Sequence, residues 1–254
     1  MNELLKLENI SLAYQTDSDE IVALKSISFG VYSGEFVAII GPSGCGKTSV
    51  LSIIAGLLKP TGGKVTLGGE KIAKGKNSIG YMLQRDELFP WRTIEENAYL
   101  PLEVKKNRSA EEKTKVIDLL KKYGLWEFRK KYPSQLSGGM RQRAALIRTM
   151  ASSPDLLLLD EPFSALDYQT RLSVCDDLYD IIRKEKKTAL LVTHDISEAL
   201  STADRIIVLT KRPAKILNIH IIDLDKTKSP LKRREDPRFS KFFERLWREL
   251  NYEK

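Results

Sequence analysis

A glycine-rich string after an apolar run limits this chain more than any other feature does. Phe36–Ile40 is apolar throughout, and it is followed directly by Gly41-Pro42-Ser43-Gly44-Cys45-Gly46-Lys47-Thr48. Residues 47–58 then have helical character and stop at a Pro-Thr-Gly-Gly segment. Gly-x-x-x-x-Gly-Lys-Thr between a strand and a helix is the P-loop pattern. It predicts a loop whose backbone N–H groups surround phosphates at a helix N-terminus.

The residue types in this string match the parts of a nucleotide site. Lys47 is expected to reach the β- and γ-phosphates, and Thr48 to offer its hydroxyl to Mg²⁺. The string and the residue after it supply the predicted ATP-binding residues Gly41, Pro42, Ser43, Gly44, Cys45, Gly46, Lys47, Thr48 and Ser49. The alternative is a glycine-rich structural turn. The strand before the string and the helix after it favour the nucleotide site.

A second run of apolar residues ends in two carboxylates. Leu156–Leu159 reads as a buried strand, and Asp160 and Glu161 follow it. Burial of four leucines would bring this strand into the sheet centre and both carboxylates to its C-terminal edge, where open α/β sheets bind ligands. We therefore expect Asp160 to bind Mg²⁺ and Glu161 to polarise the attacking water. The alternative is a pair of strand-end carboxylates in solvent.

The pattern of strands and helices predicts a mainly parallel α/β sheet. Strand character dominates the first part of the chain, a mostly helical stretch follows, and strands alternating with helices resume after it. Such alternation is typical of a parallel sheet covered by helices. The expected division is an α/β ATP-binding core of residues 1–85 and 154–215, a helical subdomain of residues 86–153, and a basic C-terminal extension of residues 216–254.

Composition limits the location and the partners of the chain. Its apolar runs are too short to cross a bilayer, and its start lacks a basic leader followed by an apolar core. Cys45 and Cys175 form no paired ligand spacing, which argues against a disulfide framework or a zinc site and fits a reducing cytosol.

The net charge is +8, and part of the excess lies in Lys226, Lys228, Lys232, Arg233, Arg234, Arg238 and Lys241. A solvated basic face, an anionic membrane surface and a polyanion all remain open as explanations.

A third string makes the chain resemble a known family. The string is Leu136-Ser137-Gly138-Gly139-Met140, and it lies between the P-loop and the Asp-Glu strand end. It resembles the LSGGQ-type signature of ABC transporter ATP-binding subunits, which carry the three motifs in this order. The likeness extends from about Leu5 to Thr210. It implies a P-loop NTPase fold with a RecA-like parallel sheet core, an N-terminal antiparallel β portion and an inserted helical signature lobe. Met140 departs from the usual glutamine, and we interpret it as a tolerated variant.

The same resemblance implies roles for residues outside these strings. Tyr14 stands where the family has an aromatic residue that stacks on adenine, although it also fits an ordinary aromatic residue at a strand end. Gln84 matches the glutamine that reaches Mg²⁺ and the attacking water, and His194 matches the switch histidine that contacts the γ-phosphate. The implied catalytic residues are Glu161, His194 and Gln84, and the implied metal ligands are Thr48, Gln84 and Asp160.

In the family, two subunits pack head to tail around two ATP. Ser137, Gly138 and Gly139 are thus expected to contact the ATP of a partner chain, and Asp167 lies in a segment, residues 164–167, that resembles the loop crossing to the partner. The resemblance therefore implies a homodimer that closes on ATP and opens after hydrolysis. No nucleic acid is expected as a partner, because the soluble ABC proteins that act on DNA or ribosomes have features that this chain lacks.

The branch of the family is indicated by the segment after Gln84. There Leu88, Phe89 and Trp91 are expected to receive an integral membrane permease, although they also fit the core of the helical lobe. The chain resembles the nitrate/sulfonate/taurine importer ATPases in three segments, namely residues 88–97, 211–216 and 236–250. The expectation is a peripheral protein on the cytoplasmic face of the membrane, served indirectly by an extracytoplasmic solute-binding protein. An importer of pyrimidine vitamin precursors, a soluble ABC ATPase acting on nucleic acid, and a P-loop kinase are the alternatives.

Overall fold

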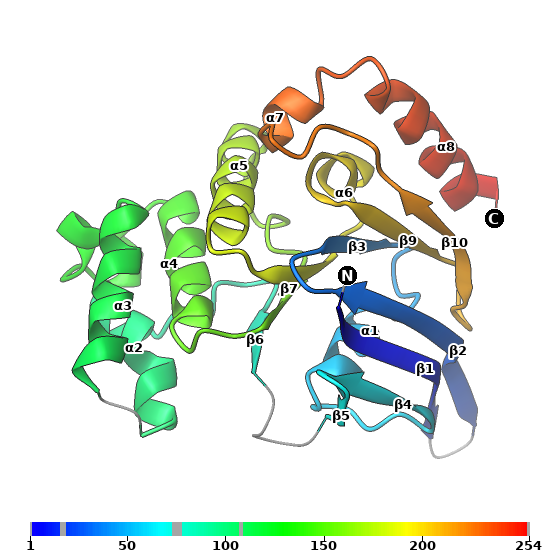
Figure 1. The fold of residues 1–254 in the computed structure, drawn as a ribbon, viewed down its shortest axis with the longest axis horizontal. Coiled ribbons are helices and arrows are strands. Elements are labelled where there is room, and N and C mark those ends of the chain that lie inside the picture. Colours follow the sequence, from blue (N-terminus) through cyan, green and yellow to red (C-terminus); the bar gives the residue numbers. More distant parts are fainter. Residues whose placement is uncertain (1, 16–18, 73–77, 107–108, 253–254) are drawn as a thin grey trace. The chain divides into compact units, whose positions relative to one another are not determined.

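The chain divides into two compact units. The structure is a computed structural model that describes residues 2–15, 19–72, 78–106 and 109–252 (Figure 1). Unit 1 comprises residues 1–77 and 186–254, and unit 2 comprises residues 78–185. Unit 2 is therefore one continuous stretch of sequence inserted into unit 1.

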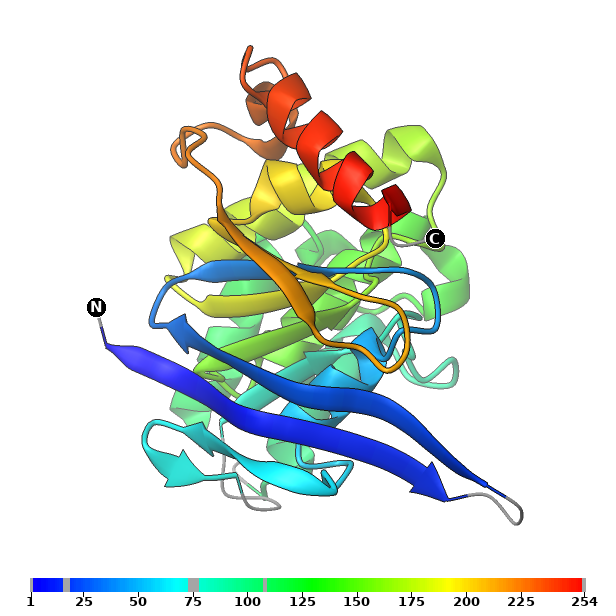
Figure 2. The same cartoon turned by 90° about the vertical axis from the view of Figure 1, so that its right-hand side faces the viewer.

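Unit 1 contains an antiparallel sheet built from the N-terminal part of the chain. Its strands run in the order β2-β1-β4-β5, and β1 and β2 are the two long strands in Figure 2. Their bounds are Glu3–Gln15 for β1, Glu20–Tyr32 for β2, Gly62–Leu67 for β4 and Glu70–Lys71 for β5. The predicted N-terminal antiparallel portion is thus confirmed.

The second sheet of unit 1 places the glycine-rich string. In this unit its strands run in the order β10-β9-β3-β8, with β9, β3 and β8 parallel and β10 antiparallel to β9. The bounds are Phe36–Ile40 for β3, Thr188–Val192 for β8, Arg205–Leu209 for β9 and Ile216–Ile221 for β10. Every residue of β3 and β8 is buried, which explains their unbroken apolar character.

Helix α1 begins immediately after the string. It spans Lys47–Ile54, so the helix expected over residues 47–58 is too long. The helix ends early because Gly56 turns the backbone into the left-handed region, with a φ of 71°, and its N–H bonds to Ile53 O. A glycine adopts this conformation without the steric cost that a Cβ atom would bring.

The C-terminal part of the chain folds onto unit 1. Helix α6 (Ile196–Thr202) contacts both α7 (Pro230–Arg233) and α8 (Phe239–Tyr252) (Figure 2). Arg233 is completely buried and donates from Nη2 to Ala203 O at 2.9 Å. The interpretation of this basic segment as a solvated face is therefore wrong for Arg233, because that side chain belongs to the core.

Unit 2 combines a pair of strands with helices. Strands β6 (Ile79–Met82) and β7 (Leu156–Asp160) are parallel neighbours. The helices are α2 (Ile94–Val104), α3 (Ala110–Lys122), α4 (Gly138–Met150) and α5 (Tyr168–Lys184), with 3₁₀ turns at Trp126–Phe128 and Pro133–Gln135. Each of these four helices begins at a side-chain cap that accepts a backbone N–H, namely Thr93, Ser109, Ser137 and Asp167.

The boundaries of the units differ from the predicted division. Strands β6 and β7 and helix α5 lie in unit 2 with the helical segment, and residues 216–254 lie in unit 1. The functional division into core, signature subdomain and extension stays a prediction. Among the described residues, no helix has both the length and the apolar character that crossing a bilayer requires.

Candidate functional site

The glycine-rich string of unit 1 forms a loop that curls at the N-terminus of α1. Gly44 and Gly46 have φ values of 72° and 112°, in the left-handed region. Gly46 is the N-cap of α1, and no side chain accepts a hydrogen bond there. Lys47 is buried, and its Nζ donates to Gly41 O at 2.9 Å and to Pro42 O at 3.0 Å. The loop therefore joins a helix N-terminus to a fixed ammonium group, which together suit an anion.

Gly46 cannot be replaced without moving its surroundings. A Cβ atom at this position would lie 2.8 Å from Leu24 Cδ2, in addition to the strain of its positive φ. We expect Gly46→Ala to weaken Mg-ADP binding at least about tenfold and to lower the free energy of unfolding by about 1–3 kcal/mol. Calorimetric titration and urea unfolding measure both effects.

Gly34 offers a matched control for this substitution. It also has a positive φ, 76°, but nothing lies within 4 Å of its would-be Cβ atom. Gly34→Ala should show only the backbone strain, about 1 kcal/mol, and unchanged ADP affinity. Equal ADP affinities of Gly46→Ala and the wild-type protein would contradict a role of this loop in nucleotide binding.

Two further predicted residues of unit 1 lie at the same edge as the loop. Tyr14, at the end of β1, is 39% exposed, and its Oη lies 3.0 Å from Ser49 Oγ on α1. His194 is exposed and follows β8, which is parallel to β3 and adjacent to it. The carboxyl ends of these two strands therefore lead to His194 and to the glycine-rich loop, respectively.

The residues on either side of His194 are held firmly. Thr193 Oγ1 donates to Glu198 Oε2 at 2.6 Å and accepts from Asp195 N at 3.0 Å. Thr193 and Glu198 are both buried, and Asp195 caps α6. The turn that presents His194 is thus anchored on both sides, while the histidine side chain itself is exposed.

In unit 2, the end of β7 brings the predicted carboxylates together with Gln84. Asp160 is buried and accepts a hydrogen bond from Tyr81 Oη at 3.2 Å. Glu161 has a φ of 45°, which turns the chain sharply after the strand. Gln84 Nε2 lies 3.5 Å from Glu161 Oε2 and donates to Ser164 Oγ at 3.2 Å. The loop after β6 and the end of β7 thus place an amide beside a carboxylate.

The signature string lies at the start of α4. Ser137 caps this helix, and its Oγ accepts from Met140 N at 3.3 Å. Gly138 and Gly139 approach neighbouring side chains closely: added Cβ atoms would lie 3.0 Å from Leu166 Cδ2 and 2.8 Å from Val174 Cγ2. Side chains larger than glycine at these two positions would therefore crowd Leu166 and Val174 inside unit 2.

Several predicted residues of unit 2 line one cavity of about 530 Å³. They are Gln84, Ser137, Gly138 and Asp167. Asp167 also caps α5, and its hydrogen bonds from Thr170 lower the pKa of its carboxyl group. The cavity joins the loop after β6 to the start of α4, so residues far apart in sequence meet there.

The predicted docking segment is only partly exposed. Leu88 is buried, whereas Trp91 is 70% exposed and stacks on Phe89 with ring centroids 5.0 Å apart. Asn97, which is completely buried, receives a hydrogen bond from Phe89 N and donates to the carbonyl oxygens of Phe89, Arg92 and Thr93. This amide holds the loop in one shape and leaves Trp91 as its most exposed large apolar side chain.

Two arginines attach the segment after Gln84 to helix α4. Arg141 Nε lies 3.0 Å from Asp86 Oδ2, and its Nη1 donates to Leu136 O at 2.9 Å. Arg148 donates to the carbonyl oxygens of Asp86 and Glu87 at 2.7 and 2.6 Å. The helix that begins at the signature is therefore bound directly to the segment that leads to Trp91.

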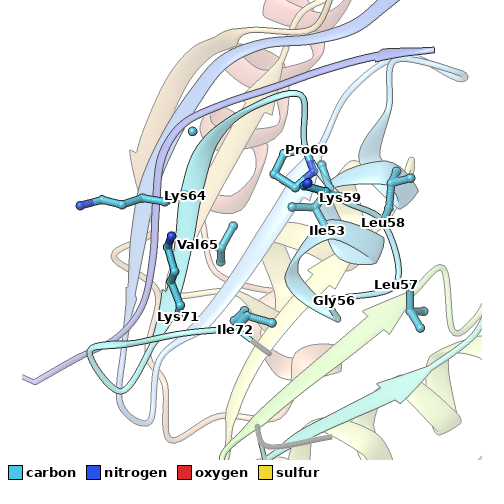
Figure 3. Close-up of a pocket in the computed structure, with 11 residues that line it drawn as sticks. Ile53, Gly56, Leu57, Leu58, Lys59, Pro60, Lys64, Val65, Lys71 and Ile72 are labelled. Atoms are coloured by element: carbon cyan, nitrogen blue, oxygen red, sulfur yellow. The ribbon is translucent and has the colours of Figure 1, made fainter. Parts of the chain in front are cut away.

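A cavity in unit 1 lies away from the glycine-rich loop. It has a volume of about 540 Å³ and is lined by Ile53, Val65 and Ile72 among others, between the C-terminal end of α1 and strands β4 and β5 (Figure 3). The glycine-rich loop is at the opposite, N-terminal end of α1. None of the predicted site residues lines this cavity, so its size does not indicate the reaction site.

The loop at a helix N-terminus after a buried parallel strand defines a P-loop nucleoside triphosphatase. The family model described as "ABC transporter" matches residues 24–164. The chain belongs to the ABC transporter ATP-binding family, and it is an ATPase. The predicted family and fold class are thereby confirmed.

Relatives of the chain are ATP-binding proteins. An uncharacterized ABC transporter ATP-binding protein, YtlC of Bacillus subtilis, is 44% identical over 97% of this chain and 95% of its own length. An aliphatic sulfonates import ATP-binding protein, SsuB of Bacillus cereus, is 38% identical over 84% of this chain and 83% of its own. The ATP-binding cassette MJ0796, solved as a dimer in a post-hydrolysis state with ADP and Pi, matches 86% of this chain and 99% of its own at 35% identity, with a TM-score of 0.74.

Some residues that shape the site were not predicted. Tyr81, Asn97, Arg141 and Arg148 act by hydrogen bonds to residues between 4 and 79 positions away. The sequence could have indicated Tyr81, because it lies on the strand that precedes Gln84. It could not have indicated the two arginines, because a charged residue on a polar helix is usually solvated.

Proposed function

We propose that this chain is the ATP-hydrolysing subunit of an ABC importer, which moves a small anion of nitrate, sulfonate or taurine type through a separate membrane permease. The observation that carries the importer assignment is the 38% identity to an aliphatic sulfonates import ATP-binding protein over 84% of this chain. The proposed location is the cytoplasmic face of the membrane, where the chain would bind the permease peripherally.

ATP binding is assigned to unit 1. The backbone N–H groups of Gly41–Thr48 and the ammonium of Lys47 suit the phosphates, and Tyr14 beside α1 suits adenine. Hydroxyl, amide and carboxylate oxygens are the ligands that Mg²⁺ prefers, and Thr48, Gln84 and Asp160 supply one of each. Mg²⁺, when bound, neutralises charge on the phosphates.

Hydrolysis is assigned to Glu161 as general base, with Gln84 and His194 as its companions. Gln84 lies against Glu161 in unit 2 and is able to orient a water molecule by its amide. His194, on a turn held by Thr193 and Glu198, is exposed and able to contact the γ-phosphate. These roles require the carboxylate to accept a proton from water while the imidazole donates to phosphate.

The proposed working form is a homodimer. The MJ0796 cassette, 35% identical, was solved as a dimer. Ser137, Gly138 and Gly139 at the start of α4 are assigned to the ATP of the partner chain, and Asp167 to the contact between chains. ATP then stabilises the dimer, and its hydrolysis releases it.

The permease is assigned to the face around Trp91. The buried Asn97 bonds to the backbone on both sides of Trp91, which preorganises the loop that carries the stacked pair Phe89 and Trp91. Arg141 and Arg148 connect the segment beside it to α4. A displacement of the docking loop is therefore passed to the signature through hydrogen bonds inside one unit.

Purification of the full chain from solubilised, nuclease-treated membranes tests this function. We expect a hydrophobic permease to co-purify, and the ligand of the accompanying solute-binding protein to be a small oxyanion. A pyrimidine precursor as that ligand would change the cargo, and capture that depends on RNA or DNA would overturn the transport assignment.

Trp91→Ala is expected to abolish most of this capture. Loss of a central exposed aromatic residue from an interface typically costs at least about 2 kcal/mol, or roughly thirtyfold in affinity. ATPase activity of the isolated chain should be unchanged. Trp247→Ala, at a 53% exposed tryptophan of unit 1, is the matched control and should retain the permease. Equal capture by both variants would move the docking face away from Trp91.

A further inference from the structure

The loop after β9 contacts the P-loop through Arg212, a residue with no part in the proposed ATP binding or hydrolysis. Arg212 Nη2 donates to Gly44 O at 2.7 Å, across 168 positions of sequence. Gly44 is exposed and has a φ of 72°, so it forms the turn at the tip of the P-loop. Both residues belong to unit 1. A charge-assisted hydrogen bond of this length is among the stronger polar contacts in proteins.

The backbone that carries Arg212 is held in place by β2. Ala214 is completely buried, its N–H bonds to Ala23 O at 2.9 Å, and its carbonyl accepts from Lys25 N at 2.9 Å. Between them lies Leu24, whose side chain packs against Gly46 of the P-loop. The same stretch of β2 therefore supports both the arginine loop and the base of the P-loop.

Hydrogen bonds within the loop keep it closed. Thr210 N bonds to Lys215 O at 3.0 Å, and Lys215 N bonds to Thr210 Oγ1 at 3.0 Å. The two ends of residues 210–215 thus meet, and Arg212 lies at the tip between them. The backbone that carries Arg212 is therefore ordered in advance, and the contact with a carbonyl has only the arginine side chain left to order.

The contact with Gly44 O determines the orientation of a whole peptide group. The peptide that joins Gly44 to Cys45 is planar, so its carbonyl and its N–H move together. Its carbonyl accepts from Arg212, and its N–H donates to Pro42 O at 3.3 Å. Both polar ends of the peptide are therefore occupied, which restricts the exposed tip formed by Ser43 and Gly44.

The same contact changes the electrostatics of the loop. A carbonyl oxygen at the tip of a phosphate-binding loop would repel phosphate oxygens, and the guanidinium group covers it with positive charge. Burial raises the pKa of the Cys45 thiol, and the charges of Lys47 and, to a smaller extent, Arg212 oppose this rise. Arg212 therefore acts on the P-loop by geometry and by charge.

We propose that Arg212 is a positioning residue of the P-loop, which holds the Gly44–Cys45 peptide in the orientation that binds the polyphosphate of ATP and ADP. This inference rests on the proposed assignment of Gly41–Thr48 as the ATP-binding loop. It predicts an effect on nucleotide affinity with the chemical step preserved, because Arg212 contacts the loop and none of the groups assigned to hydrolysis.

The test compares four variants of the full chain: Arg212→Ala, Arg212→Lys, Lys211→Ala and Lys47→Ala. Lys211 is the exposed neighbour on the same loop and controls for the loss of one positive charge. Steady-state hydrolysis gives KM and kcat for ATP, calorimetry gives the Kd for Mg-ADP, and thermal unfolding shows that each variant is folded.

We expect Arg212→Ala to raise KM for ATP and the Kd for ADP about 5- to 20-fold, with kcat within about twofold of wild type. Arg212→Lys should recover part of the loss, because an ammonium group also donates to a carbonyl, and Lys211→Ala should change either value by less than about twofold. Wild-type affinity of Arg212→Ala, or equal losses in the lysine and alanine variants at position 212, would overturn the proposal.

Lys47→Ala separates this proposal from the assignment of the loop. Loss of ADP binding in Lys47→Ala together with wild-type binding in Arg212→Ala rejects the role of Arg212 alone. Wild-type ADP binding in Lys47→Ala rejects the loop as the nucleotide site, and the role of Arg212 falls with it.

Discussion

Replacement of Glu161 by glutamine is expected to reduce kcat for ATP hydrolysis by about 10²- to 10³-fold, with little change in ATP affinity. Glutamine has nearly the shape of glutamate, so the turn at this residue and its contact with Gln84 are preserved. What is lost is a group that accepts a proton from water. Phosphate release under saturating ATP and Mg²⁺ measures the effect.

The same variant should accumulate as a dimer in ATP and Mg²⁺, since the contact that hydrolysis normally releases persists. Size-exclusion chromatography with light scattering measures this population. Glu127→Gln is the matched control, because Glu127 is exposed on a 3₁₀ turn of unit 2 and the same atoms are exchanged there. If Glu161→Gln stays monomeric with ATP, the proposed dimer mechanism is wrong.

Replacement of Arg233 by alanine is expected to lower the free energy of unfolding by about 2–4 kcal/mol. The side chain is completely buried and donates from Nη2 to Ala203 O at 2.9 Å, directly after α6. The alanine side chain fills only a small part of the space that the arginine occupied, so a cavity remains. The carbonyl of Ala203 also loses the hydrogen-bond donor that Arg233 supplied. Urea unfolding followed by circular dichroism measures the change.

Lys232→Ala is the matched control for this prediction. Lys232 lies on the same helix, is exposed, and precedes Arg233 directly. Its replacement should alter the free energy of unfolding by less than about 0.5 kcal/mol. Equal stabilities of the two variants would show that the buried side chain of Arg233 does not help to anchor the C-terminal segment to unit 1.

The sequence alone indicates the role of Glu161, but it does not indicate the burial of Arg233. Glu161 follows a leucine strand directly, and its role is suggested by adjacent residues. Arg233 is one of seven lysines and arginines in residues 226–241, and nothing in the sequence distinguishes it from the other six. The buried side chain donates to Ala203 O, which is 30 positions away, and no periodicity in the chain predicts that hydrogen bond.

The docking segment shows the same limit. Leu88 and Trp91 are both large and apolar on one short loop, and both were predicted to receive a permease. The structure buries Leu88 and leaves Trp91 exposed, because the buried Asn97 fixes the backbone between them. A loop of this kind is shaped by hydrogen bonds from a neighbouring helix, and apolar character alone does not reveal its direction.

The sequence by itself determined the P-loop, the strand that ends in Asp160 and Glu161, and the start of α4 at Ser137. Each is encoded by adjacent residues, since glycines with positive φ, apolar strands and serine caps act over a few positions. The tertiary structure alone decided that Arg212 reaches Gly44, that Arg148 holds the segment after Gln84, and that Arg233 is buried. These contacts join residues 30 to 168 positions apart, and only the folded chain brings their atoms within hydrogen-bond distance.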